Sequence, residues 1–216
     1  MSGPTAWLTR VRAWCLYDWA NSAFATTVMA AVLPPYFARV AASGLSPADA
    51  AALWGYASSG FLLVAAIVSP LVGAVAGSRG SARGPFAIAV GIGAVATAFL
   101  FGAGAGDWQW VLVAYGIAFV CFSAATVLYD GLLPAVAAPA ERDAVSTRGF
   151  AWGYAGGGLL LAQRFGCDGL RAKTLGSNEF SFLARRPESA LGSIHFAVSF
   201  PPVSAIELFA IDKFVE

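Results

Sequence analysis

Long apolar runs separated by short polar loops dominate the chain as far as Gln163, and they predict helices that cross a membrane. A transmembrane helix needs about 20 mostly apolar residues. Four runs reach that length: 13–33, 53–76, 86–105 and 110–133. A fifth run, 150–162, gives only about 20 Å of helix, less than a hydrocarbon core of about 30 Å. We therefore expect four full spans and an incomplete fifth.

The pattern changes at Gln163, and this change divides the chain into three parts. Residues 1–163 carry 13 of the 25 charged side chains, and the other 12 fall in a much shorter tail. We expect a cytoplasmic N-terminal segment at 1–12, a transmembrane helix bundle at 13–162 and a poorly ordered polar tail at 163–216. The predicted fold class is an all-α membrane protein that ends in a tail unrelated to the bundle.

The arginines of the short loops predict the orientation of the spans. Six of them lie on one side of the membrane, in alternate loops, and only Arg39 lies on the other side. The six are Arg10, Arg12, Arg79, Arg83, Arg142 and Arg148. Because basic loops stay in the cytoplasm, we expect a cytoplasmic N-terminus and a multi-pass protein of the plasma (inner) membrane.

Composition supports this class and excludes others. Hydrophobic residues make up 58% of the chain and charged residues 12%, against about 45–50% and about 25% in soluble domains. A soluble fold of this size cannot bury so much apolar surface. The net charge of +1 offers no basic patch for nucleic acid. The expected partner is the lipid bilayer.

Polar residues in the first run share one helical face. Asp18 and Asn21 are three residues apart and Ser22 is four from Asp18, with Tyr17 beside them. A carboxylate at the centre of a span costs about 2.5–3.5 kcal/mol, so it normally faces protein or a watery cavity. Two interpretations stay open: these four residues line a transport pathway, or Asp18 only pairs with Arg12 or Arg10 at the helix end.

A second acid lies at a comparable depth in the fourth run. Tyr129 and Asp130 come near its cytoplasmic end, just before Pro134. Two acids from different helices at one level could bind a cation or a proton between them. The alternative is that Asp130 only contacts a loop arginine such as Arg142.

Small residues recur at four-residue intervals. Ser69, Gly73 and Gly77 form one such series, and Gly153 and Gly157 form another. This spacing lets helices approach closely in lipid. We assign these residues to helix packing, including self-association between copies of the chain.

No set of residues in the predicted bundle suits catalysis. Positions 13–162 contain no His or Lys, and the three cysteines are far apart without a C-x-x-C spacing. General acid–base and nucleophilic chemistry therefore have few candidates. We predict no enzymatic activity, no metal site and no cofactor.

Several motifs are similar to those of a known family. The stretch Leu16–Thr27 resembles the first helix of the vacuole-effluxer family of the major facilitator superfamily. Pro70–Ala76, Leu132–Pro134 and Ser146–Tyr154 add supporting matches. The resemblance extends over about residues 12–162, the N-terminal part of such a transporter. It implies alternating access, in which two six-helix halves rock about a central site.

The same resemblance implies roles for particular residues. Helices one and four line the cavity in such transporters, which favours a pathway role for Asp18, Asn21 and Asp130. Gly73, Arg79, Arg83 and Arg148 would belong to the cytoplasmic loops and gate, although the acid expected between residues 76 and 83 is missing. The implied cargo is a small solute such as an amino acid. Coupling to protons is a separate hypothesis that rests on Asp18.

Three functional hypotheses follow. The leading one is a truncated copy of a transporter that is inactive alone. The second is a non-transporting membrane scaffold or assembly subunit that binds a partner through its small-residue faces and its tail. The third is a half-transporter that works as a dimer.

Overall fold

The computed structural model describes residues 4–78 and 80–175, and every regular element in these ranges is a helix. Residues 1–3, Arg79 and positions 176–216 lie outside the described residues, so most of the predicted tail is among them. Four helical segments are long and apolar enough to cross a membrane. This confirms the expected class, an all-α protein with four full spans.

The first span is a continuous helical rod that is longer than the predicted 13–33. It comprises α1 (Pro4–Ala23), the π-helix η1 (Phe24–Val32), α2 (Leu33–Tyr36) and the π-helix η2 (Phe37–Ala41). The prolines expected to end it stand at the first positions of α2. They are tolerated inside the rod because π-helical segments lie on both sides of α2, so the regular α-helical hydrogen-bond pattern that a proline would interrupt is already changed there.

The next three spans follow the predicted apolar runs, with shifted ends. They are α3 (Pro47–Ser78), α4 (Arg83–Phe99) with the 3-10 turn η3 (Leu100–Gly102), and α5 (Trp108–Val136). Two prolines, Pro70 and Pro134, lie inside helices rather than at their ends.

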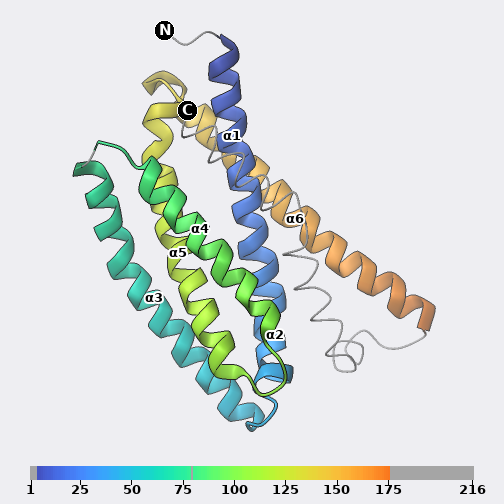
Figure 1. Cartoon of the computed structure of the whole chain (residues 1–216). Helices are drawn as coiled ribbons and strands as arrows, with labels where there is room; N and C mark the ends of the chain where they lie inside the picture. The colour runs from blue at the N-terminus through green and yellow to red at the C-terminus, as the bar shows by residue number, and fades with distance from the viewer. Residues whose placement is uncertain (1–3, 79, 176–216) are drawn as a thin grey trace.

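The fifth helix extends across the predicted boundary at Gln163. After the 3-10 turn η4 (Pro139–Glu141), α6 runs from Arg142 to Leu175 without a break. The apolar pattern therefore stops within a helix, and the first residues of the predicted tail are helical. α6 crosses α1 at an angle (Figure 1), and it is not among the four segments that could span a membrane.

The helices pack in two groups that share α5. α5 lies against α3 and α4, while α1 packs mainly on α6 and also touches α5. Figure 1 shows α3, α4 and α5 side by side, with α1 beside them and α6 behind the upper part of α1. This arrangement places the polar face of the first span between α5 and α6.

The buried core forms two clusters at opposite ends of the bundle. One gathers around Trp14, Tyr17, Phe86 and Tyr129, and the other around residues 28–42 with α3 and α5. Between them, the only described hydrophobic residues that are buried are alanines, accompanied by small hydroxyl residues. These are Ala20, Ala65, Ala96, Ala118, Ala124, Thr27, Ser69 and Thr97. We call these small residues the waist; the half-buried rings of Phe24 and Phe122 also meet in this middle region, with centroids 5.5 Å apart.

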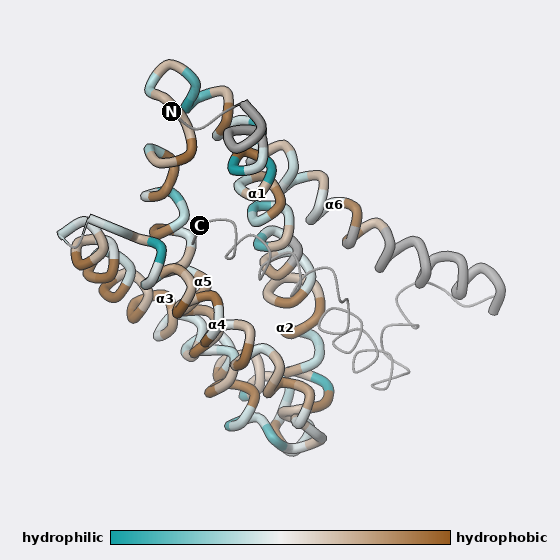
Figure 2. The backbone as a smooth tube through the Cα atoms, turned by 45° about the horizontal axis from the view of Figure 1, so that its top comes forward, coloured by the Kyte–Doolittle hydropathy of each residue, from teal (hydrophilic) through white to brown (hydrophobic). Residues whose placement is uncertain are grey.

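The outer surface of the spans is apolar. Large hydrophobic side chains are exposed along α3, α4 and α5, among them Leu62, Ile67, Ile92 and Val113. The backbone coloured by hydropathy shows the same apolar character along these helices (Figure 2). Contiguous exposed apolar surface of this kind is unfavourable in water and favourable in hydrocarbon. The chain is a multi-pass membrane protein in contact with lipid.

We expect Gly116→Ala to weaken the packing of α3 on α5. A Cβ at Gly116 would lie 2.5 Å from Cε1 of Phe61, and overpacking of this kind costs about 1–3 kcal/mol. Gly131→Ala on the same helix is the matched control, because a Cβ there has no atom within 4 Å. Thermal unfolding in detergent should show a lower midpoint for Gly116→Ala only. Equal midpoints for the two variants would contradict this packing.

Candidate functional site

An aromatic contact joins α1 to α5 near the N-terminal end of the first span. The rings of Trp14 and Tyr129 are stacked, with centroids 3.7 Å apart and planes at 18°. The Tyr129 hydroxyl donates a hydrogen bond of 3.0 Å to the backbone oxygen of Trp14. In an α-helix the same oxygen accepts the amide of Asp18. Tyr129 thus binds the turn of α1 that carries the acid.

Tyr17 extends this contact to α4. Its ring centroid lies 4.8 Å from that of Tyr129 and 4.8 Å from that of Phe86, which it meets edge-on. The Tyr17 hydroxyl donates a 3.4 Å hydrogen bond to Oδ1 of Asn21. We call Trp14, Tyr17, Phe86 and Tyr129 the aromatic cluster; all four side chains are buried.

Glycines of α6 cover the other side of this turn. A Cβ at Gly149 would lie 2.9 Å from Nε1 of Trp14 and 3.3 Å from the Tyr129 hydroxyl. Helices α1, α5 and α6 therefore meet at one point. Further along α6, Gly153, Gly156 and Gly157 also face α1, and we call these four glycines the glycine seam.

The polar face of α1 rests on the glycine seam. A Cβ at Gly153 would lie 2.6 Å from Oδ2 of Asp18 and 2.7 Å from Oγ of Ser22. The hydroxyl of Thr26 donates a 2.9 Å bond to the Ser22 carbonyl and reaches the carbonyl of Gly157 at 3.5 Å. The seam thus lets α6 approach polar groups that would otherwise face lipid.

The two acids lie on different helices near the aromatic cluster. Asp18 is half-buried one turn after Trp14, and Asp130 is an exposed residue directly after Tyr129. Asp130 directly follows Tyr129, which contacts the turn of α1 that carries Asp18, so the two acids lie in the same region of the bundle. Among the described residues neither carboxylate forms an ion pair, and Arg142 instead points its Nε at the carbonyl of Ala137 at 3.5 Å. The two ion pairs considered for the helix ends, Asp18 with an N-terminal arginine and Asp130 with Arg142, therefore do not form among the described residues.

The structure separates the other predicted residues from this site. Gly73 packs on Val127 of α5, since a Cβ at Gly73 would lie 3.2 Å from Cγ1 of Val127. A Cβ at Gly77 would have no atom of another element within 4 Å. Ser69 is buried in the waist, and its hydroxyl has no hydrogen-bond partner.

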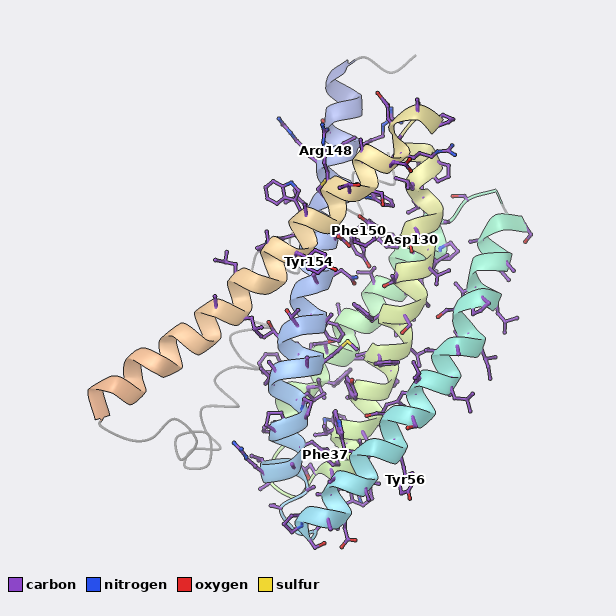
Figure 3. All side chains as sticks on the ribbon, turned by 180° about the vertical axis from the view of Figure 1, so that it is seen from behind. Phe37, Tyr56, Asp130, Arg148, Phe150 and Tyr154 are labelled. Carbon is purple, nitrogen blue, oxygen red and sulfur yellow. The ribbon has the colours of Figure 1, made fainter. Side chains whose placement is uncertain are left out.

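Of the predicted gate residues, two basic side chains are placed. Arg83 begins α4. Arg148 precedes the glycine seam and lies in the same half of the bundle as Asp130, while Phe37 lies at the opposite end (Figure 3). Arg79 is outside the described residues. The described residues contain no group of three or more His, Cys, Asp or Glu side chains that could hold a metal ion.

Trp14, Phe86 and Gly149 contribute to the site although the sequence analysis did not single them out. Two of them could have been found from spacing. Trp14 is four residues before Asp18 and so shares its helical face, and Gly149 is four residues before Gly153. Phe86 carries no such signal, because its contact with Tyr17 depends on how α4 packs against α1.

This chain is similar to YxiO, a curated protein of Bacillus subtilis (strain 168). The name of that protein gives it as an uncharacterised transporter of the major facilitator type. The two are 36% identical over 144 residues, which is 66% of this chain and 34% of the relative. The chain thus spans about a third of the length of the curated relative it matches. No family model matches the chain, and no solved structure matches it.

We expect Tyr129→Phe to loosen the contact between α5 and α1. The variant keeps the stacked ring and removes the hydroxyl that bonds to the Trp14 carbonyl. A hydrogen bond of this kind contributes about 0.5–1.5 kcal/mol. Tyr56→Phe is the control, because the Tyr56 side chain is 80% exposed. The midpoint of thermal unfolding should fall for Tyr129→Phe alone. A fall in the midpoint no larger than that of the control would contradict the role of this hydroxyl.

Proposed function

We propose that the chain forms the first helices of a secondary transporter of the major facilitator type. The similarity to the Bacillus protein YxiO supports the assignment to transporters of the major facilitator type. The observation that carries the proposal is the half-buried Asp18, which lies in a spanning helix without an ion pair among the described residues and near Asp130 of a second span. An acid so placed is costly in lipid, and such acids typically mark solute or proton pathways.

The bundle offers a physical basis for this role. The waist of small residues separates two clusters of larger side chains, and Asp18, Asn21 and Ser22 of α1 follow directly after the aromatic cluster. Transporters of this type bind their cargo near the middle of the bundle. Asp18 is the group that we expect to take up and release the coupled proton, and Asp130 on α5 is the second acid of the proposed pathway.

The cargo that we propose is a small solute such as an amino acid, as the resemblance to the vacuole-effluxer family implies. We place the protein in the plasma (inner) membrane with its N-terminus in the cytoplasm. In that orientation Arg83 and Arg148 belong to the cytoplasmic side, where they are expected to act with Gly73 and Arg79 in the loops and gate. No enzymatic step is part of this proposal.

The prediction of a truncated copy is open to a direct check in the DNA downstream of the coding region. If another reading frame there encodes seven further hydrophobic spans, restoring the frame should give a protein that moves solute. The chain alone should then move none in proteoliposomes. Transport by the chain alone would instead favour the dimerising half-transporter, and a stoichiometric membrane complex without transport would favour the scaffold.

We expect Asp18→Asn to abolish proton-coupled uptake of amino acids in whichever of these forms is active. The amide keeps the size of the side chain but cannot exchange a proton. Asp143→Asn is the control, since Asp143 lies exposed in the first turn of α6. Uptake driven by a pH gradient in proteoliposomes measures the effect. Unchanged uptake in Asp18→Asn would exclude Asp18 as the coupling group.

A further inference from the structure

One glycine of α6 faces the acid of α1. A Cβ at Gly153 would meet Oδ2 of Asp18 at 2.6 Å, Oγ of Ser22 at 2.7 Å and Cγ of Asp18 at 3.2 Å. These separations are shorter than van der Waals contact, so every residue other than glycine would displace one or both side chains. The carboxylate therefore lies directly against the backbone of α6.

The other members of the glycine seam face different groups. Gly149 faces Trp14 and the Tyr129 hydroxyl, Gly156 faces the ring of Trp19, and Gly157 faces the methyl group of Thr26. Only at Gly153 does the seam meet a carboxylate. This difference separates a role in helix approach, which all four share, from a role that concerns the acid.

We propose that Gly153 is a positioning residue for the Asp18 carboxylate, and this inference rests on the proposed transport function. The carboxylate has no ion pair among the described residues to fix it. Its position is therefore set by the surfaces around it, and the bare backbone at Gly153 is the nearest of these on α6. A methyl group there pushes the carboxylate away from α6 and changes its exposure to water and to α5.

Several ionisable groups surround this carboxylate. Cys15 lies on the same helix, and Tyr129 and Asp130 lie on α5, which contacts this turn of α1 through the Tyr129 hydroxyl. Arg148 lies on α6 directly before Gly149, which contacts the same turn. Displacement of Asp18 changes its distance from all of them, so its proton uptake should change even where the fold is kept.

Labelling with dicyclohexylcarbodiimide measures the protonation of Asp18 without any need for transport. The reagent partitions into membranes and adds to a protonated carboxyl group. The carboxyl proton moves to a carbodiimide nitrogen, and the O-acyl adduct rearranges to a stable N-acylurea. Peptide mapping by mass spectrometry assigns the adduct to Asp18, with Asp18→Asn as the blank. The rate of labelling as a function of pH gives a midpoint for this residue.

In Gly153→Ala we expect the midpoint to move by about one pH unit, a tenfold change in protonated fraction. Two variants of the same helix are matched controls. Gly158→Ala adds a methyl group where no atom lies within 4 Å, and Gly157→Ala disturbs the same interface at Thr26. Both should keep the wild-type midpoint, although Gly157→Ala should lower thermal stability.

A midpoint in Gly153→Ala equal to that of Gly158→Ala would overturn the proposal, and so would an equal shift in Gly157→Ala. If Gly153→Ala fails to accumulate, Gly153→Ala with Ser22→Ala removes the contact to the serine hydroxyl and keeps that to Asp18. The shift should persist in this double variant, and its absence there would also overturn the proposal. Absence of solute uptake in every form would count against the transport function alone, because labelling does not depend on it.

Discussion

The contact between the polar face of α1 and the glycines of α6 is the constraint on which the arrangement of this bundle depends. In lipid the hydrophobic effect does not drive helices together, so association relies on close packing and on hydrogen bonds. The first span carries Asp18 and Ser22 of α1 and Thr26 of η1 on the side that faces α6. That face is costly in hydrocarbon, and the glycine seam lets the backbone of α6 cover it.

The aromatic cluster completes this junction from the other side. Tyr129 stacks on Trp14 and bonds to its carbonyl, so α5 fixes the same turn of α1 that α6 contacts at Gly149. The acid one turn later is therefore held between two helices that differ in chemistry. The buried rings of the aromatic cluster fill one end of the bundle, and the fully buried residues of the waist, next to Asp18, have small side chains. This contrast is what makes Asp18 a candidate for proton coupling.

Much of this architecture can be predicted from the sequence. The apolar runs identify four spans, and helical spacing places Asp18, Asn21 and Ser22 on one face. Local rules fail where tertiary context decides. Prolines near position 34 suggest a helix end, yet the rod continues through them, with a π-helical segment on either side of α2. The stack of Trp14 on Tyr129 joins residues 115 positions apart, and no local pattern encodes such a contact. The continuation of α6 past Gln163 is likewise invisible to a hydropathy pattern.

Disulfide trapping tests the contact of α1 with α6 most directly. A Cβ at Gly157 would lie 2.9 Å from Cγ2 and 3.2 Å from Oγ1 of Thr26, a separation that suits two cysteine side chains. With the native cysteines replaced, Thr26→Cys paired with Gly157→Cys should form a disulfide on mild oxidation in native membranes. Thr26→Cys paired with Gly158→Cys should not. No disulfide in the first pair, or equal yields in both, would contradict the packing of α1 on the glycine seam.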